Sequence, residues 1–596
     1  MICVMAAVML PAGLALGAGT APGAGTKPAP TEYGELLEQA KGCVQSGMWG
    51  PFMEEVNRRT TARFAQAKDK VPTEAIRDLF YFQNVGTMFS KATGAEEKEM
   101  LGWLMDHRGI CGRFLHALDE HDDLTAALGI LKRLRDEDPE LFVRNSEMCI
   151  AYAVVWDNFR PQRYWKRPEI EPDTMMNTYR YFNRNAKMMQ IPPGTLPWEL
   201  AVYVVDLSVT TDERTWALAN YANQRDIGRL FFKVPYTMKL SPAHGNGVDI
   251  PYTLQNILQI GGVCMEQAHF ASSVGKCVGV PSAYCYGAGK RGGHAWVSFL
   301  RMDKQPVRWD LDSGRYSYDH YYKGLTLDPT NWGYQNSIPL SELQMSAAIL
   351  TAGSAQKLED SRYCDDAARW LGTYAKEEWS GQAAYELLQR SLGICAYNGE
   401  TWLTLAELAE GGKLTEQQTG QSVDLLFKYT LNDFPDFTEM CLERFVGSVK
   451  DNQRKAAILA RAFALFRARP DLASEIKVAE GDVLLAQGKV KEAVVAYCWP
   501  LAEFPEEGHA TGAVEERIEK LGEHVPDKAQ LAEVYKSLLN SIVKNSGNTS
   551  EGLTNIFRAL SEKLVALYKE TGREKEAASL AKFADAWLAS RPVKAN

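Results

Sequence analysis

A short segment in the middle of the chain combines paired glycines, a cysteine and a histidine in a spacing that constrains the local fold. Residues 261–268 read Gly-Gly-Val-Cys-Met-Glu-Gln-Ala, and residues 292–296 read Gly-Gly-His-Ala-Trp. The glycines interrupt whatever precedes Cys264, and residues 265–274 have the apolar spacing of a helix, so the cysteine is predicted at a helix N-terminus. His294 opens an alternating segment, which predicts a strand. A fold that contains this segment therefore needs a helix packed on a sheet.

The residues between Cys264 and His294 predict how the chain connects them. Residues 278–281, Val-Gly-Val-Pro, follow the predicted helix and indicate a turn. Residues 282–286 then predict a short strand, and a glycine-rich loop follows it. The strand that carries the histidine is expected over residues 294–301.

A third segment supplies carboxylates beside the histidine strand. Residues 307–312, Val-Arg-Trp-Asp-Leu-Asp, predict a strand that pairs antiparallel with it. Because side chains alternate along a strand, Asp310 and Asp312 are expected on one face, from which either reaches His294. Asp312 is the first choice for this partner and Asp310 the second.

The chemistry of thiols explains why this pattern points to catalysis. A cysteine attacks as its thiolate, and most of an ordinary thiol is protonated at neutral pH. The N–H groups of a helix N-terminus and an imidazolium neighbour both favour the negative charge, so we expect the pKa of Cys264 to fall. A carboxylate on the far nitrogen of His294 would hold the ring, and the backbone N–H of Cys264 would stabilise an oxyanion.

The remaining polar side chains of this segment have less specific patterns. Gln255, Asn256 and Gln259 all precede Cys264 closely enough to be a second oxyanion donor, and the sequence does not choose among them. Trp296 is a candidate for the wall of a substrate cleft or for the core.

These blocks resemble the transglutaminase-like superfamily, which includes papain-like transamidases, amidases and peptidases. The family's usual motifs are Gly-x-Cys-x-Glu/Asp-x-Ala, Gly-Ile/Val-Pro, His-Ala-Trp and a strand that ends in Asp. The corresponding residues here, in the same order, are 262–268, 279–281, 294–296 and 311–312. The resemblance covers roughly residues 235–335. It implies a papain-like core in which Cys264 is the nucleophile and His294 its base.

The resemblance adds a further candidate for the third catalytic residue. The family often carries Leu-Asp-Pro-Thr, and residues 327–330 have this sequence. Asp328 lies far beyond His294 for a simple hairpin return, so it ranks third, after Asp312 and Asp310.

We therefore expect acyl transfer at an amide bond through a Cys-His-Asp triad and a covalent acyl-enzyme. A protein or peptide is the expected substrate, and the acceptor is water in a peptidase or amidase and an amine in a transamidase. The alternative is an inactive fold of the same family that binds proteins or peptides. No Cys-x-x-Cys or His-Glu-x-x-His motif and no dinucleotide fingerprint occurs in the sequence, so neither a metal nor a cofactor is expected.

Composition and the N-terminal residues limit the partners and the compartment. The chain has 596 residues, a net charge of −9 and 45% hydrophobic residues, which is typical of a globular protein and argues against a nucleic-acid binder. An apolar run followed by Ala and Gly predicts a signal peptide within residues 1–25, and hence export to the periplasm or the extracellular space. No later run is long enough to span a membrane.

The expected fold class is α+β, with helical regions on both sides of the papain-like core. Residues 26–234 predict a helical domain, residues 235–374 the transglutaminase-like domain and residues 375–596 a helical repeat domain. One stretch of the last region resembles a tetratricopeptide repeat, at Gly481, Leu484, Gly488, Ala493, Tyr497 and Pro505. A weaker copy runs through Tyr568, Gly572, Ala577 and Ala584. We predict a divergent α-solenoid that serves as a partner-binding surface or as a buttress.

Overall fold

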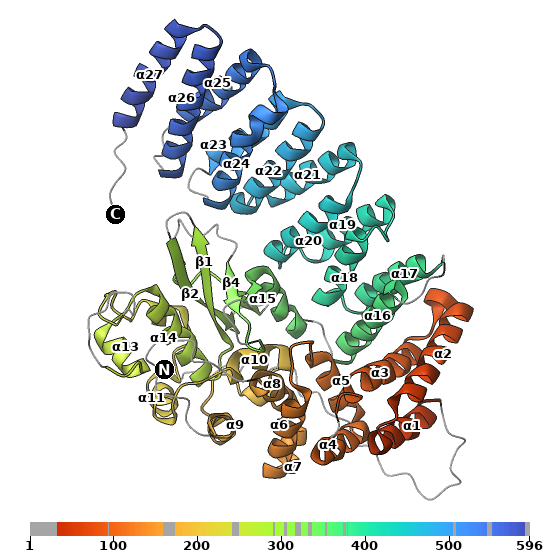
Figure 1. Cartoon of the computed structure of the whole chain (residues 1–596). Coiled ribbons are helices and arrows are strands. Elements are labelled where there is room, and N and C mark those ends of the chain that lie inside the picture. Colours follow the sequence, from red (N-terminus) through yellow and green to blue (C-terminus); the bar gives the residue numbers. More distant parts are fainter. Residues whose placement is uncertain are drawn as a thin grey trace, which may run out of the picture. The chain divides into compact units, whose positions relative to one another are not determined.

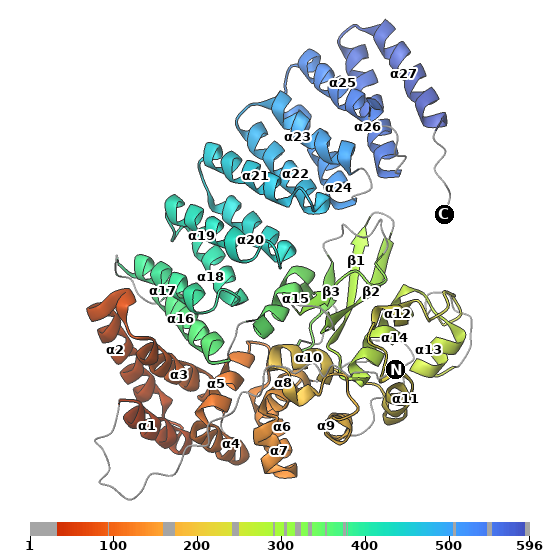
Figure 2. The same ribbon diagram turned by 180° about the vertical axis from the view of Figure 1, so that it is seen from behind.

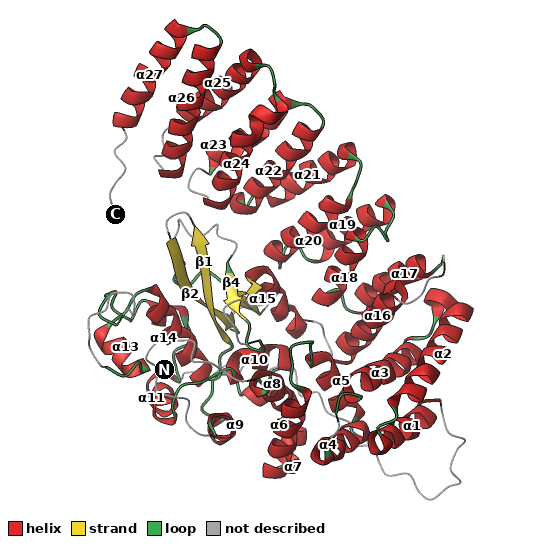
Figure 3. Cartoon of the chain, viewed as in Figure 1, coloured by secondary structure: helices red, strands yellow, loops and turns green. Residues whose placement is uncertain are grey.

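The computed structural model has an α+β fold in which helices predominate and one antiparallel sheet stands among them (Figure 1, Figure 3). It describes residues 32–590 apart from 93, 159–172, 241–249, 290–291, 303–306, 316–323, 332–336, 352–354, 374–376, 378, 505–507 and 545–550. The predicted signal peptide, residues 1–25, lies outside the described residues.

Two compact units make up the chain. One contains Met1–His116 together with Ile349–Thr401, and the other contains Ala117–Ala348 together with Trp402–Asn596. Each unit thus joins two separate stretches of sequence. The boundaries predicted at residues 234 and 374 stay predictions.

The first unit is helical in its described residues. Its elements are α1 Glu32–Ser46, α2 Trp49–Ala67, η1 Lys68–Lys70, α3 Thr73–Phe89, α4 Ala95–Asp106, α5 Arg108–Ala117, α16 Ala355–Thr373 and α17 Ser380–Ile394. Helix α16 packs on α3 and α17. Trp370 of α16 lies 6.3 Å from the rings of both Phe64 and Phe80, so aromatic packing joins the two stretches of this unit.

The second unit begins with helices that surround one fully buried helix. These elements are α6 Leu124–Glu137, α7 Pro139–Arg144, α8 Ser146–Trp156, α9 Thr174–Asn185, η2 Pro193–Thr195, α10 Trp198–Val205, α11 Thr211–Tyr221, α12 Gly228–Phe231 and α13 Leu254–Ile260. Helix α8, SEMCIAYAVVW, is apolar on all sides and nearly all of its residues are buried, as expected of a helix inside a core. It packs on α6 and α10.

The sheet has five short strands, and one helix covers it. The strands are β1 Ser282–Gly289, β2 Gly292–Arg301, β3 Arg308–Asp310, β4 Leu325–Leu327 and β5 Ser337–Pro339. Their order is β3-β2-β1-β4-β5, and every neighbouring pair is antiparallel. Helix α14, Cys264–Cys277, packs on β1 and β2, and Figure 2 shows the sheet and this helix from behind. The predicted helix and strands are therefore confirmed, although β1 and β2 extend into the residues predicted as a glycine-rich loop and β3 ends at Asp310.

Helices return after the sheet. They are α15 Leu340–Ser346, η4 Ala347–Thr351, α18 Gly399–Glu410, α19 Glu416–Tyr429, α20 Pro435–Ser448, α21 Asn452–Phe466, α22 Pro470–Ala486, α23 Val490–Glu503, α24 Gly508–His524, α25 Lys528–Lys544, α26 Glu551–Glu570 and α27 Glu574–Ala589. From α19 on, most helices pack against the next one in sequence. A Cβ atom at Gly481 would lie 2.3 Å from a ring carbon of Tyr497, so this glycine lets α22 and α23 cross closely, as the repeat pattern predicts. Pro505 lies outside the described residues.

Candidate thiol active site

Two glycines shape the loop that delivers Cys264 to the first position of α14. Gly261 has a φ of +86°, and a Cβ atom there would lie 2.2 Å from the carbonyl oxygen of Pro235. The N–H of Gly262 donates to that same carbonyl at 3.0 Å, and the N–H of Thr237 donates to the Gly262 carbonyl at 2.9 Å. The glycines thus allow a neighbouring segment to lie directly against the cysteine loop.

Glu266 closes the first turn of this helix. Its carboxylate accepts a hydrogen bond from the N–H of Val263 at 2.7 Å and one from the hydroxyl of Tyr252 at 3.1 Å. The side chain is fully buried, and burial raises its pKa. A buried carboxyl group thus lies two residues from the thiol.

The thiol of Cys264 is half-buried, and three nearby backbone N–H groups, those of Ala295, Met265 and Cys264 itself, act to lower its pKa. These donors favour the thiolate. Burial nevertheless raises the pKa of Cys264, and the negative charge of Glu266 adds to this effect. The predicted fall of this pKa is therefore wrong, because the loss of hydration outweighs the helix terminus.

The N–H of Ala295 shows that the thiol lies against the start of β2. His294 immediately precedes Ala295 on this strand, so the predicted base belongs to the strand segment that the thiol approaches. The imidazole is buried, with 7% of its surface exposed. Its ring stacks on Trp296 with 5.9 Å between centroids and 19° between planes. Burial lowers the pKa of His294.

The Nε2 atom of His294 lies 2.8 Å from the carbonyl oxygen of Gly314. A carbonyl only accepts hydrogen bonds, so Nε2 must carry the proton in the neutral ring, and Nδ1 then carries the lone pair. The same carbonyl also favours the charged ring and opposes the effect of burial on the pKa. A proton acceptor at this site is therefore Nδ1.

Asp310 is not on the same face of the sheet as His294. It pairs with Phe299 across β2 and β3, and paired side chains share a face. His294 and Phe299 are an odd number of residues apart on β2, so their side chains point to opposite faces. The expectation that strand alternation directs Asp310 to His294 is therefore wrong.

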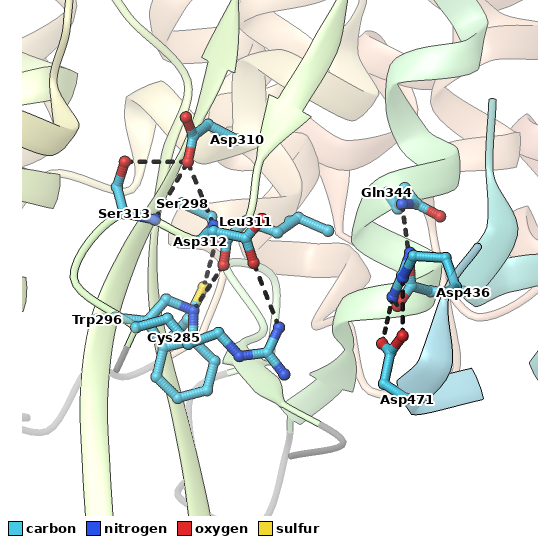
Figure 4. A network of polar contacts seen from close by, with 12 residues as sticks. Cys285, Trp296, Ser298, Asp310, Leu311, Asp312, Ser313, Gln344, Asp436 and Asp471 are labelled. Carbon is cyan, nitrogen blue, oxygen red and sulfur yellow. Dashed lines mark hydrogen bonds and ion pairs between the residues drawn. The ribbon is translucent and has the colours of Figure 1, made fainter. Parts of the chain in front are cut away.

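The side chain of Asp310 instead organises the turn after β3. Its Oδ1 accepts hydrogen bonds from the N–H of Asp312 at 3.2 Å, from the N–H of Ser313 at 3.1 Å and from the Ser313 hydroxyl at 3.0 Å (Figure 4). Its Oδ2 lies 3.4 Å from the guanidinium of Arg301.

Asp312 lies in that turn rather than on the strand. Its side chain is 64% exposed and lies 3.6 Å from the guanidinium of Arg315. Asp328 follows β4, which β1 separates from β2, and its carboxylate accepts from the N–H and hydroxyl of Thr330 at 2.9 and 2.8 Å. Strand spacing alone puts β4 about 10 Å from β2. A carboxylate as the third catalytic residue stays a prediction.

The other predicted site residues lie in different environments, from the core to the exposed surface. Trp296 is fully buried and donates from Nε1 to the Leu311 carbonyl at 3.0 Å, so it belongs to the core and not to a cleft wall. Gln259 is exposed. Gln255 has a buried Oε1 without a hydrogen-bond partner among the described residues, and the amide of Asn256 donates to the Pro251 carbonyl at 2.8 Å. None of the three is shown at the thiol.

Two participants were not foreseen from the sequence, the N–H of Ala295 and the carbonyl of Gly314. Backbone groups are the same in every residue, so the sequence does not show which of them will take part in a site. The only indication was Asp-Ser-Gly at residues 312–314, which is typical of a turn. Every cysteine that the structure describes is a free thiol.

No protein-family model matches this chain, and no curated protein matches it either. Among the described residues, no three His, Cys, Asp or Glu side chains are grouped so as to hold a metal ion. The described helices include none with the length and apolar character to cross a membrane.

Proposed function

We propose that this protein is a thiol enzyme that acts on amide bonds through a covalent acyl-enzyme. One observation carries the proposal. The thiol of Cys264, at the first position of α14, lies near the N–H of Ala295, the residue next to His294. A nucleophile, a base and convergent N–H donors are the groups that acyl transfer needs.

The reaction would begin from a neutral pair, because burial raises the pKa of Cys264 and lowers that of His294. Nδ1 of His294 takes the thiol proton as Sγ bonds to the amide carbon, and the negative charge moves to the carbonyl oxygen, near the N–H of Cys264. The C–N bond then breaks, and the imidazolium gives its proton to the leaving amine. Water or a second amine, deprotonated by Nδ1, cleaves the thioester and restores the thiol.

The surroundings of the thiol support a substrate with an apolar side chain. Phe232 and Tyr236 are 67% and 58% exposed, although exposed aromatic residues are uncommon. The phenol of Tyr236 interacts electrostatically with Cys264, and Phe231, the neighbour of Phe232, lies 6.4 Å from the His294 ring. We propose that this aromatic rim contacts a protein or peptide substrate.

The proposal includes the family-level features that the sequence suggested. A helix that carries the cysteine and packs on an antiparallel sheet supports a papain-like, transglutaminase-like core. Serial packing of α21 to α27 supports an α-solenoid that binds a partner. Export to the periplasm or the extracellular space belongs to the same proposal.

A second candidate is a binding protein that keeps the fold without the chemistry. The raised pKa of the Cys264 thiol favours it, as does a carbonyl in place of a carboxylate at Nε2 of His294. Chemical reactivity of the thiol separates the two candidates.

The deciding experiment measures the alkylation of each cysteine by iodoacetamide as a function of pH, with mass spectrometry of the cysteine peptides. Cys498 is the matched control, because it is also half-buried and burial also raises its pKa. At pH 7 we expect Cys264 to react about tenfold or more faster than Cys498, because a base next to a thiol promotes its reaction.

The pH profile should show the role of His294. Its neutral form is the base, so the reactivity of Cys264 should appear as the pH rises through the lowered pKa of this histidine. In His294→Ala the alkylation rate of Cys264 should rise only at the higher pH at which the thiol itself ionises, since its pKa is raised. Equal rates for Cys264 and Cys498 over the whole range, or no effect of His294→Ala, would favour the binding protein.

A further inference from the structure

We propose that the turn of residues 310–315 orients the imidazole: the carbonyl of Gly314 accepts from Nε2 of His294, and Asp310 is a positioning residue that holds this carbonyl in place. The inference rests on the proposed function. In this role the carboxylate of Asp310 acts on the imidazole through the turn, because the register of β3 puts it on the opposite face of the sheet from His294.

The imidazole is constrained on two sides. Gly314 accepts from Nε2 at 2.8 Å, and Trp296 stacks on the ring face. Trp296 is itself anchored to this turn, because its Nε1 donates to the carbonyl of Leu311 at 3.0 Å. A displacement of the turn would therefore move both contacts of the ring.

Asp310 determines the path of the turn. One oxygen of its carboxylate binds three donors from Asp312 and Ser313, which are the two N–H groups and the hydroxyl (Figure 4). Two backbone hydrogen bonds complete the turn: the N–H of Arg315 donates to the Asp312 carbonyl at 3.0 Å, and the N–H of Val297 donates to the Ser313 carbonyl at 3.2 Å. The residues on both sides of Gly314 are thus held.

Gly314 occupies a position that excludes other residues. Its φ is +88°, and a Cβ atom there would lie 2.7 Å from the ring of Phe231. The left-handed backbone points the carbonyl toward β2 at a close approach to α12, where a side chain has no room. The acceptor for His294 is therefore built from backbone that only glycine allows.

Arg315 anchors the far end of the turn. Its side chain is only 10% exposed, its guanidinium carbon lies 5.3 Å from the centre of the Trp296 ring, and its charge interacts with Asp436 and Asp471. These two carboxylates also bind Arg469, at 2.9 and 2.6 Å. Arg315 thus packs on Trp296 at one end of the turn, and Asp310 binds its donors at the other.

The test compares substitutions that keep or remove the acceptor oxygen. In Asp310→Asn the amide oxygen can still accept the three donors, whereas Asp310→Ala loses them all. For a carboxylate that contacts the histidine, loss of the charge alone is damaging. If Asp310 is a positioning residue, Asp310→Asn should keep the alkylation rate of Cys264 that Asp310→Ala loses.

The readout is the pH profile of Cys264 alkylation by iodoacetamide in the full chain. We expect Asp310→Ala to lower the rate at pH 7 about tenfold or more, as for other groups that act through an orienting contact, and to give a profile like that of His294→Ala. Asp310→Asn should keep the wild-type profile. Asp312→Asn and Asp312→Ala should also keep it, because that carboxylate is exposed.

Arg301→Gln is the control for the ion pair of Asp310, and it should leave the profile unchanged, since Arg301 contacts only Oδ2. If Asp310→Ala does not fold by circular dichroism, Ser313→Ala removes only one of the three donors and should lower the rate about two- to fivefold. An unchanged rate in this variant would overturn the proposal.

Two other results would overturn the inference while the proposed function survives: Asp310→Asn as damaging as Asp310→Ala, or a large loss in Asp312→Asn. The first would mean that the charge of Asp310 acts directly, and the second would restore Asp312 as the partner of His294. If His294→Ala itself leaves the alkylation profile unchanged, the proposed function fails, and the two failures are thus distinguishable.

Discussion

At the scale of single residues, Glu266 opposes the ionisation of the thiol that it helps to place. Its carboxylate caps the N–H of Val263, yet its negative charge raises the pKa of Cys264. In Glu266→Gln the amide oxygen can still accept from Val263 while the charge is gone. We expect the alkylation profile of Cys264 to shift to lower pH, with a rate about threefold higher at pH 7, which corresponds to half a pKa unit.

Tyr252→Phe is the control for this substitution, because it removes the hydroxyl that donates to Glu266 at 3.1 Å and leaves the charge in place. In Tyr252→Phe the alkylation profile of Cys264 should shift to higher pH or coincide with that of the wild type. A Glu266→Gln profile that coincides with the wild type would show that the charge of Glu266 does not raise the pKa of Cys264.

At the scale of elements, the loop before α14 depends on a left-handed residue and a close backbone contact. Gly261→Ala would place a Cβ atom 2.2 Å from the Pro235 carbonyl at a φ of +86°. We expect the folded state to lose about 1–3 kcal/mol, the usual cost of strained backbone, and the thermal unfolding midpoint to fall accordingly. Cys264 should also become less selective in alkylation, because its helix terminus moves.

Gly420→Ala is the matched control, since this glycine lies within α19 and nothing would lie within 4 Å of a new Cβ atom. An alanine in a helix interior stabilises it by up to about 1 kcal/mol relative to glycine. A midpoint for Gly261→Ala that equals that of Gly420→Ala would contradict the importance of the loop.

At the scale of the whole molecule, two carboxyl groups make stability depend on pH. Asp122 and Asp157 share a hydrogen bond, and burial raises the pKa of both. Asp157 also accepts the N–H of Asp123 at 2.6 Å, so the pair ties a loop to the end of α8. The folded protein keeps a proton here up to a higher pH than the unfolded chain, whose aspartates titrate near about 3.9.

The sign of the effect follows from this difference in bound protons. Between the unfolded and the raised folded pKa values the folded state binds more protons, so stability falls as the pH rises. Differential scanning calorimetry of the wild type should show a lower unfolding midpoint at pH 8 than at pH 5. Asp122→Asn should flatten this dependence and raise the midpoint at pH 8.

Asp424→Asn serves as the comparison, because Asp424 belongs to an exposed ion pair with Arg461, and such pairs contribute less than about 1 kcal/mol. Its midpoint should follow the wild type at both pH values. A wild-type midpoint that rises from pH 5 to pH 8 would contradict the burial of protonated carboxyl groups.

The amino-acid sequence was sufficient to predict the local elements of the candidate site. Two glycines before Cys264, the apolar spacing after it and the alternation after His294 predicted a helix that begins at the cysteine and a strand that carries the histidine, and both are present. These features follow from preferences of a few adjacent residues, which act whatever the rest of the chain does.

The contacts of His294 and the ionisation of Cys264 depended on the tertiary structure. Alternation shows which residues of a strand share a face. The register of β3 against β2 decides on which side of the sheet that face lies, and here it puts Asp310 on the side opposite to the imidazole. The carbonyl that takes its place belongs to the backbone of Gly314, which has no residue-specific signal. The pKa of the thiol rises because surrounding elements remove water from it, and burial is a sum over residues distant in sequence.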